Sequence, residues 1–259
     1  MAPLEVLVTG GAGFIGSNLA LELEKNRHKV TIVDNLFSGT ENNLVDFKGK
    51  FMNSDISKQV KFPGEFDIIF HMAAITDPRY EKDEDMYEKN LNGFKLMLDL
   101  ALKSNSKFVY ASTANLYGNG PIPMREDQKK EIITAYGKSK LEMDEMAGRH
   151  FGKMHVVGLR YFNVFGPREA HKGRSASMIY HLYKAMREGR VPRLFEFGEQ
   201  KRDHIYVKDA VNATIKAINA PSGIYNVGTG IATDFNELVE ILNETLGTKL
   251  ETEYFKMPY

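Results

Sequence analysis

The stretch Thr9-Gly10-Gly11-Ala12-Gly13-Phe14-Ile15-Gly16 stands between a short apolar run and an amphipathic stretch. Its glycines recur as G-x-x-G-x-x-G, a spacing typical of a strand-to-helix turn that binds a dinucleotide. Gly10 would allow the tight turn, Gly13 the close approach of a pyrophosphate, and Gly16 the packing of helix on strand. The start of the helix would offer free N–H groups to the phosphates. An ordinary strand-to-helix turn would also explain the glycines, so the prediction depends on the rest of the chain.

Short apolar runs alternate with longer amphipathic stretches through the first 160 residues. This alternation is typical of the α/β class and indicates a Rossmann-type doubly wound parallel sheet. Several runs are apolar on both faces, as buried parallel strands are. We expect strands at 5–9, 29–34, 50–53, 67–71, 107–112 and 154–160, and helices at 14–25, 86–104 and 132–150.

The pattern changes after Arg160, where Gly, Pro and Arg become common. This change predicts a second, smaller α/β lobe. We expect helices at 176–188, 209–220 and 234–246, and strands at 202–207, 224–228 and 251–255. We assign residues 1–163, with about 205–230, to an NAD(P)-binding domain, and residues 164–204 and 231–259 to the substrate-binding lobe.

Asp34 ends the second expected strand, 18 residues after Gly16. A carboxylate at this position can accept hydrogen bonds from an adenosine ribose and would repel a 2′-phosphate. A strand-end aspartate is also a common turn residue. Together with the upstream glycines, Asp34 favours NAD as the cofactor, with NADP as the alternative.

Composition excludes several classes of partner. Lys plus Arg and Asp plus Glu both total 34, so the net charge is zero and neither nucleic acid nor an anionic membrane is an expected partner. The absence of cysteine fits a reducing compartment. We find no leader and no long apolar span, and the histidines show no metal-ligand spacing, so we expect a cytoplasmic protein without a metal site.

Tyr136 and Lys140 are four residues apart in an expected helix, so both side chains would project from one face. A neighbouring cation favours phenolate and would lower the pKa of the tyrosine, making it a better base. Thr113 follows an expected strand and would bring its hydroxyl to the same carboxyl edge of the sheet, where it could polarise a substrate hydroxyl. A Tyr/Lys pair on a solvated helix and a strand-end threonine would be the structural alternatives.

In these motifs the chain resembles the extended short-chain dehydrogenases/reductases. The resemblance covers nearly the whole chain, and its matching segments occur in the family order. They are Thr9–Gly16, Val33-Asp34-Asn35, Asp55-Ile56, His71-Met72-Ala73-Ala74, Ala111-Ser112-Thr113 through Tyr117-Gly118, Tyr136 with Lys140, and Arg160-Tyr161-Phe162-Asn163.

The resemblance implies roles for these positions. Thr113, Tyr136 and Lys140 would be catalytic, and Lys140 would also hold the cofactor ribose. Asp55 and Ile56 would contact adenine, and Asn90 would steady the segment that passes beside the cofactor. The implied cofactor-binding set is Gly10, Gly13, Phe14, Ile15, Gly16, Asp34, Asn35, Asp55, Ile56, Met72, Ala73, Ala74, Ile75, Thr76, Asn90, Tyr136, Lys140 and Val164.

Ala170-His171-Lys172-Gly173 narrows the resemblance to the ADP-glycero-manno-heptose 6-epimerases among the nucleotide-sugar enzymes. In those enzymes the lysine matching Lys172 is regarded as a second acid/base, opposite the tyrosine matching Tyr136. A phosphate contact or a solvated basic loop would equally account for Lys172, because lysine is a good base only when burial lowers its pKa. The substrate-binding residues implied are Thr113, Asn163, Arg174, His181, Phe195 and Arg202, with the two arginines suited to the diphosphate.

The chain departs from the heptose epimerases in four ways, one of which is the segment Ile75-Thr76-Asp77-Pro78. Glu41 stands near a lysine that helps those enzymes hold the 2′-phosphate of NADP, which again favours NAD. Arg174 stands where they carry a small residue, so the sugar is open. The chain is also shorter than they are, and we expect its substrate-binding lobe to be incomplete at the carboxyl terminus.

The leading hypothesis is therefore an NAD(P)-dependent epimerase that inverts a carbinol carbon of a nucleotide-diphosphate sugar through a transient ketone. ADP-glycero-manno-heptose is the first substrate candidate, and a UDP-glucose or other UDP-hexose 4-epimerase is the alternative. A nucleotide-sugar reductase, or an NAD-binding protein without catalysis, would share the cofactor motif. The resemblance also implies a homodimer or a larger homo-oligomer.

Overall fold

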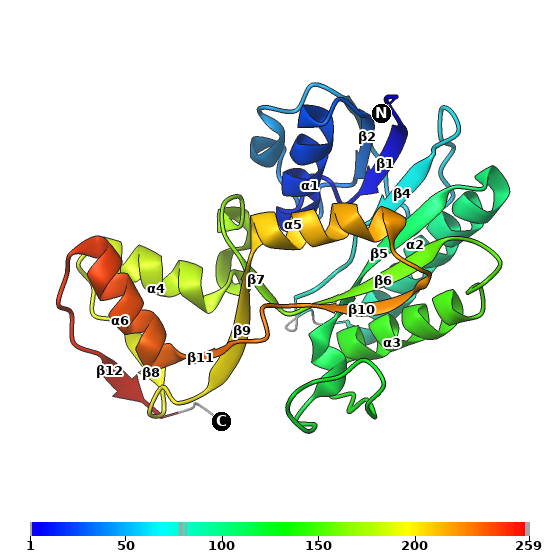
Figure 1. Ribbon diagram of the computed structural model, residues 1–259. Coiled ribbons are helices and arrows are strands. Elements are labelled where there is room, and N and C mark those ends of the chain that lie inside the picture. Colours follow the sequence, from blue (N-terminus) through cyan, green and yellow to red (C-terminus); the bar gives the residue numbers. More distant parts are fainter. Residues whose placement is uncertain (1, 78–79, 81, 257–259) are drawn as a thin grey trace.

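A seven-stranded sheet runs through the computed structural model, which describes residues 2–77, 80 and 82–256 (Figure 1). The strand order is β10-β6-β5-β4-β1-β2-β3, and every neighbouring pair is parallel. This is the doubly wound α/β fold expected from the sequence. The strands are β1 (Glu5–Thr9), β2 (Lys29–Asp34), β3 (Lys50–Asn53), β4 (Ile68–His71), β5 (Lys107–Thr113), β6 (Val156–Tyr161) and β10 (Gly223–Val227).

The strand order reverses at β1. From β1 the chain proceeds through β2 to β3 on one side, and then returns to form β4 on the other side of β1. In open parallel sheets, ligands bind in the crevice outside the carboxyl ends of the strands at such a switch point. The glycine-rich turn directly follows β1, so the fold places this turn at the crevice.

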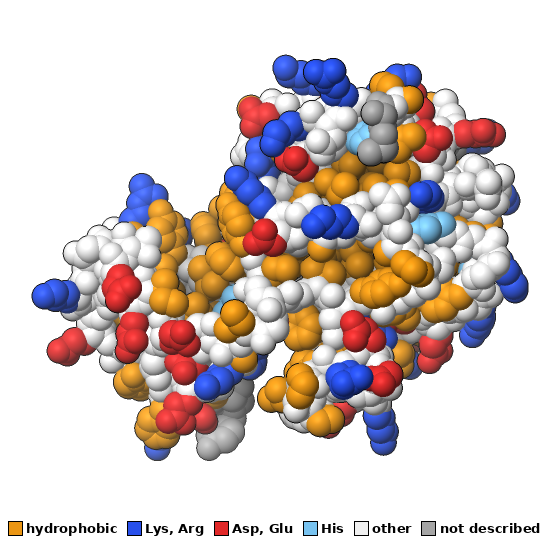
Figure 2. Space-filling model, in the orientation of Figure 1, with side chains coloured by type: hydrophobic (Ala, Val, Ile, Leu, Met, Phe, Trp, Pro, Cys, Tyr) orange, Lys and Arg blue, Asp and Glu red, His pale blue; other side chains and the backbone are white. Residues whose placement is uncertain are grey.

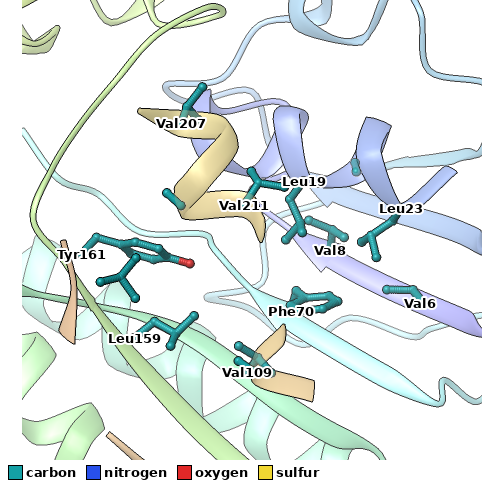
Figure 3. Close-up of a cluster of buried hydrophobic side chains, with 14 of the residues drawn as sticks. Val6, Val8, Leu19, Leu23, Phe70, Val109, Leu159, Tyr161, Val207 and Val211 are labelled. Atoms are coloured by element: carbon teal, nitrogen blue, oxygen red, sulfur yellow. The ribbon is translucent and has the colours of Figure 1, made fainter. Parts of the chain in front are cut away.

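Helices cover both faces of the sheet, because alternate residues of each strand point to opposite faces. Val6 and Val8 of β1 pack beneath the helices α1 (Phe14–Lys25) and α5 (Val207–Lys216), as Figure 3 shows. Leu7 points the other way and packs in a second cluster with α2 (Asp83–Ser104) and α3 (Ala135–Gly148). Burial of both faces explains why these strands are apolar throughout.

Two smaller sheets lie at the other end of the molecule (Figure 1). Leu194 of the two-stranded sheet packs with α4 (Met178–Arg187) and α6 (Phe235–Leu246) in a separate apolar cluster that includes Leu182 and Leu238. Figure 2 shows a notch in the surface between this end and the rest of the molecule. The strands are β11 (Ala232–Asp234), β9 (Lys201–Tyr206) and β7 (Asn163–Phe165) in one sheet, and β12 (Glu253–Phe255) and β8 (Arg193–Phe195) in the other.

Several predicted boundaries were wrong. The helix expected at 132–150 begins after Thr134, whose side chain accepts a hydrogen bond from Gly137 N and caps it, and it ends at 148. The helix expected at 176–188 is likewise capped by Ser177 and spans 178–187. The helix expected at 86–104 starts at 83, the helix expected at 209–220 spans 207–216 and continues as a 3-10 turn, and the strand expected from 154 starts at 156.

Short elements were missed. The strands β7, β8 and β11 have three residues each, which is too short to show a two-residue period. The 3-10 helices η1 (Glu41–Leu44), η2 (Ala114–Tyr117) and η3 (Ala170–Ser175) carry no helical periodicity either. None of the helices described is both long and apolar enough to cross a membrane.

Candidate active site

A cavity of about 690 Å³ opens at the switch point, beside the carboxyl ends of β1, β2 and β4. It is large enough for a dinucleotide-sized ligand. The structure brings together there most of the cofactor-binding residues expected from the sequence, and Lys172 with them. These lining residues are Gly10, Gly13, Phe14, Ile15, Gly16, Asp34, Asn35, Asp55, Ile56, Met72, Ala73, Ala74, Ile75, Thr76 and Asn90.

The glycine-rich turn can form only with glycine at two positions. Gly10 has a φ of +65°, and a Cβ there would lie 2.7 Å from the backbone of Ala73. A Cβ at Gly16 would lie 2.1 Å from the carbonyl oxygen of Gly10. Gly13 is the N-cap of α1 and offers no side chain to its first turn, so the N–H groups of that turn stay available to a ligand in the cavity. The turn therefore fits the diphosphate of a dinucleotide.

The Asp34 side chain is 9% exposed and is held in place by the backbone. Its Oδ2 accepts a hydrogen bond from Ala12 N at 3.0 Å, and its Oδ1 accepts one from Leu36 N at 2.8 Å. Burial raises the pKa of this carboxyl, and the two backbone hydrogen bonds oppose that shift. Each oxygen keeps acceptor capacity toward the cavity, as ribose binding requires.

The far end of the cavity, where adenine is expected, is formed by Asp55 and Ile56 after β3. Asp55 Oδ1 accepts hydrogen bonds from Ser57 N at 3.0 Å and from Ser57 Oγ at 2.7 Å, which fixes the turn. Along the floor, Ile75 N donates to Asn90 Oδ1 at 2.8 Å, and Asn90 Nδ2 donates to Ile75 O at 3.0 Å. Asn90 thus steadies the segment 72–76.

Thr113, Tyr136 and Lys140 form one cluster outside that cavity. Thr113 ends β5 and is hydrogen-bonded to the Tyr136 side chain in the first turn of α3. Lys140 lies one turn further along α3, is fully buried, and donates from Nζ to the carbonyl oxygen of Ala111 at 2.7 Å. Its Nζ lies 5.7 Å from the centre of the Tyr136 ring. Burial lowers the pKa of Lys140 to about 8, and Asp144 opposes this shift.

One expectation about this cluster was wrong. Lys140 was expected to lower the pKa of Tyr136, but burial raises that pKa to about 12, with the hydrogen bond from Thr113 acting in the lowering direction. Tyr136 keeps part of its surface exposed, yet the protein atoms packed around it exclude enough water to penalise the phenolate. The Lys140 ammonium is directed to a β5 carbonyl group.

The cluster adjoins the inner wall of the cavity. Asn90, which lines the cavity, lies with its Nδ2 3.4 Å from Ser139 Oγ on α3. His71 also lines the cavity and lies close enough to Lys140 for repulsion by its ammonium to lower the histidine pKa, after burial, to about 3. The His71 ring is therefore neutral at physiological pH. A ligand in the cavity would have the Tyr136 cluster behind this wall.

Lys172 lines the cavity beside the start of α1. It belongs to η3, and its Nζ lies 5.5 Å from the centre of the Phe14 ring at the start of α1. Burial lowers the pKa of Lys172, and nearby Glu169 opposes the shift. A cation over an aromatic face gains electrostatic stabilisation, which orients the ammonium toward α1.

The other predicted residues do not line this cavity. Val164 packs against the core on β7, and Asn163 Nδ2 on the same strand donates to Asp203 O at 3.1 Å. Arg174 is exposed in η3, and Arg202 is exposed on β9 with Nη1 donating to Lys201 O at 2.8 Å. His181 lies on α4 and Phe195 on β8. Their proposed contacts with substrate and cofactor stay predictions.

Sequence reasoning missed several lining residues. Most stand in irregular segments after β2, β3 and β4, or in η3, where no period marks them, and four stand at the ends of β2 and β4 or on α2. A dense run of small and polar residues after Asp34 was the one available signal. The additional lining residues are Val33, Phe37, Ser38, Gly39, Thr40, Ser54, Ser57, His71, Asp77, Lys89, Gly93, His171 and Ser175.

Comparison with known proteins agrees with this geometry. Residues 6–228 match the model of the NAD-dependent epimerase/dehydratase family. The chain belongs to this family. NAD is the family cofactor, and the glycine turn, the first turn of α1 without a side-chain cap, and the Asp34 carboxylate fit it. Asp34 would hold its adenosine ribose, and the turn its diphosphate.

Three relatives that are similar over nearly the whole chain indicate possible substrates. The ADP-L-glycero-D-manno-heptose-6-epimerase of Alkalilimnicola ehrlichii is 35% identical over 98% of this chain and 84% of its own length. The enzyme of the same name from Helicobacter pylori has a TM-score of 0.93 at 38% identity, covering 98% of this chain and 85% of that one. UDP-N-acetylglucosamine 4-epimerase from Methanobrevibacter ruminantium M1 has a TM-score of 0.93 at 29% identity, covering 100% of this chain and 87% of that one.

Proposed function

We propose that this chain is an NAD-dependent epimerase of a nucleotide-diphosphate sugar, with ADP-glycero-manno-heptose as the substrate and its C6 carbinol as the reacting centre. The observation that carries the proposal is a dinucleotide-sized cavity that is lined by Lys172 and adjoined, through Asn90 and His71, by the helix that carries Tyr136 and Lys140. Tyr136 and Lys140 adjoin its inner wall, and Lys172 lines it from the side of α1. The heptose epimerases from two organisms, similar over nearly the whole chain, support the choice of sugar.

Inversion of a carbinol carbon requires loss of a hydride and a proton, and then return of both with the hydride on the opposite face. Bound NAD would supply the hydride acceptor and return the hydride. The chain must then hold the sugar, exclude water, and move the proton at the substrate oxygen. Rotation of the ketone in its pocket would bring that oxygen near a different protein group in each orientation.

Tyr136 would exchange the proton in one orientation and Lys172 in the other. The raised pKa of Tyr136 keeps the phenol protonated, so Tyr136 would donate its proton to the substrate oxygen when the hydride returns to the ketone. The proton lost from the carbinol oxygen in the other orientation would pass to Lys172 in its neutral form, and proton exchange with solvent would restore both groups after each turnover. Thr113 would orient the phenol, and Lys140 would supply positive charge that favours its deprotonation in the reverse direction. Lys172, with a pKa lowered by burial, would be the second proton carrier.

The direct test is to incubate the purified protein, without added cofactor, separately with ADP-D-glycero-D-manno-heptose and with UDP-glucose. Products are resolved by chromatography and identified by NMR. Conversion of the heptose to its 6-epimer is expected. In a parallel incubation with added NADH, its stoichiometric consumption would identify a reductase. Bound NAD without turnover of either sugar would identify a non-catalytic binding protein, and either result would contradict the proposal.

UDP-hexose 4-epimerisation is the second candidate. It is favoured by the 0.93 TM-score to a UDP-N-acetylglucosamine 4-epimerase, which equals that of the heptose enzyme. This activity would use Thr113, Tyr136 and Lys140 in the same roles, with no need for Lys172 as a base. Conversion of UDP-glucose to UDP-galactose, with no conversion of the heptose, would establish it.

We also propose that the chain prefers NAD to NADP as its cofactor. We propose further a cytoplasmic location and assembly as a homodimer or larger homo-oligomer. The buried Asp34 carboxylate supports the cofactor choice, because it would repel a 2′-phosphate. The same division of the chain into an NAD-binding domain (1–163 with about 205–230) and a substrate-binding lobe is proposed; residues 257–259 lie outside those the structure describes. Size-exclusion chromatography with light scattering tests the assembly.

A further inference from the structure

The loop that carries Lys172 is joined to the cofactor-binding turn by an asparagine on α1. Asn18 Nδ2 donates to the carbonyl oxygen of Phe14 at 2.9 Å and to the carbonyl oxygen of Pro167 at 3.0 Å. One side chain therefore bridges the first turn of α1 and the start of the loop. An amide with two N–H groups can serve two carbonyls in this way.

A second asparagine makes the same connection closer to Lys172. Asn43, in η1, is 6% exposed. Its Nδ2 lies 3.0 Å from the carbonyl oxygen of Ala12 in the glycine turn, 3.3 Å from the carbonyl oxygen of Arg168, and 3.1 Å from His171 Nδ1. The two amide hydrogens suit the two carbonyl oxygens, and the direction of the contact with His171 Nδ1 depends on the tautomer of the imidazole. This last contact is with the residue directly before Lys172.

The backbone of Asn43 and its neighbours strengthen this junction. Arg168 Nε donates to the Asn43 carbonyl oxygen at 3.3 Å, and Arg168 Nη2 contacts Asp46 Oδ2 at 3.1 Å. Inside the loop, buried Glu169 accepts hydrogen bonds from Gly166 N at 2.9 Å and from Ser177 N at 2.8 Å. The loop is thus closed on itself by a carboxylate and attached to the cofactor side by amide groups.

This attachment matters because η3 has little regular structure of its own. It is a 3-10 segment of six residues interrupted at Gly173, where φ is +52°. Such short segments do not fix a long side chain by backbone hydrogen bonding alone. The contacts at positions 167, 168 and 171 lie on one side of Lys172 and end one residue before it.

We propose that Asn43, assisted by Asn18, is a positioning residue that holds Lys172 in a fixed place relative to the glycine turn. A cofactor bound on that turn and the ammonium of Lys172 would then be held at a fixed distance from each other. Binding of NAD would therefore change the mobility and reactivity of Lys172. The inference rests on the proposed function only where it gives Lys172 a role in proton transfer. The physical connection stands on the contacts themselves.

The test compares Asn43→Asp with Asn42→Ala. Asn43→Asp keeps the shape of the side chain but replaces the amide donor by a carboxylate that faces two carbonyl oxygens and an imidazole. Asn42 is an exposed neighbour in the same 3-10 helix and is the matched control. The first measurement is the NAD dissociation constant of the apoprotein by calorimetry. The second is the pH dependence of Lys172 modification by a small amine-reactive reagent, followed by peptide mass spectrometry. The third is the determination of kcat and KM separately.

In Asn43→Asp we expect faster modification of Lys172 that NAD no longer suppresses, weaker NAD binding, and a kcat reduced about 10- to 100-fold with a smaller change in KM. Asn42→Ala should match the unmodified chain in all three measurements. A folded Asn43→Asp protein with unchanged Lys172 modification and unchanged NAD affinity would overturn the proposal. If this variant does not fold, Asn18→Ala provides the same readouts at the Pro167 contact, and an unchanged modification profile there would overturn it.

The activity of Lys172→Met separates this inference from the proposed function. Full activity of that variant would remove Lys172 from proton transfer and leave the measured attachment by Asn43 intact. Loss of activity in Lys172→Met together with an unchanged modification profile of Lys172 in Asn43→Asp would support the role of Lys172 in proton transfer and overturn the positioning role of Asn43.

Discussion

The two sides of the candidate site are built in different ways. Thr113 ends a strand, and Tyr136 and Lys140 lie on successive turns of one helix. The backbone hydrogen bonds of the sheet and of the helix therefore determine their spacing. Lys172 stands on an irregular loop whose place is determined by side-chain hydrogen bonds from Asn18 and Asn43. We therefore expect the positions of Tyr136 and Lys140 to tolerate changes in their surroundings. The position of Lys172 should be sensitive to single polar substitutions outside the site.

The largest effect is expected for Tyr136→Phe, which removes the hydroxyl and keeps the ring. Loss of a positioned acid/base group should lower kcat about 10²- to 10⁴-fold. The variant should fold and still retain NAD, because the ring and Lys140 are unchanged. Turnover of the heptose and the NAD content after purification are the measurements. Tyr225→Phe, which removes a hydroxyl that donates to Pro221 O at 2.9 Å, is the control, and equal losses in both variants would contradict the role of Tyr136.

A loss of about 10²-fold in kcat on the heptose is expected for Lys172→Met, at the lower end of the contribution of a positioned acid/base group. If Lys172 is a phosphate contact instead, KM should rise while kcat stays unchanged. Steady-state kinetics distinguish the two results. Lys184→Met, at an exposed position of α4, controls for loss of a lysine, and it should leave both constants unchanged.

Cofactor preference should respond to Asp34→Asn by about tenfold, the scale of one charge-assisted hydrogen bond. The substitution keeps the shape of the side chain and removes the charge that would repel a 2′-phosphate. Dissociation constants for NAD and NADP, measured by calorimetry, should move toward each other. Glu41→Gln should change their ratio less, because Glu41 is exposed and does not line the cavity. Equal binding of NAD and NADP by the unmodified chain would contradict the proposal that Asp34 favours NAD.

The smallest effect concerns stability and Lys140. Burial lowers its pKa to about 8 from the ordinary lysine value of 10.5, so the unfolded chain binds this proton more tightly than the folded chain does. The resulting destabilisation is present below pH 8 and is relieved as the pH rises toward 10.5. The melting temperature of the unmodified chain should therefore rise relative to that of Lys140→Met across this range, by about 2 °C or more. A constant difference between the two melting curves would contradict the lowered pKa.

The sequence alone predicted the regular part of this protein. The doubly wound sheet followed from apolar runs, because burial on both faces of a parallel strand requires them. The glycine turn followed from local sterics: the φ of +65° at Gly10 and the contact at Gly16 would exclude most other residues whatever the rest of the chain did. The pairing of Tyr136 with Lys140 followed from helical spacing, since residues four apart share one helix face.

Tertiary structure alone decided the rest. The attachment of Asn43 to the Lys172 loop joins residues 125 and 128 positions apart in the chain, and no local pattern can mark such a contact. The raised pKa of Tyr136 likewise depends on the packing around the phenol, which outweighs the nearby cation that the sequence suggested. Sterics and periodicity act over a few neighbouring residues and can be read along the chain, whereas desolvation and long-range hydrogen bonds exist only once the chain has folded.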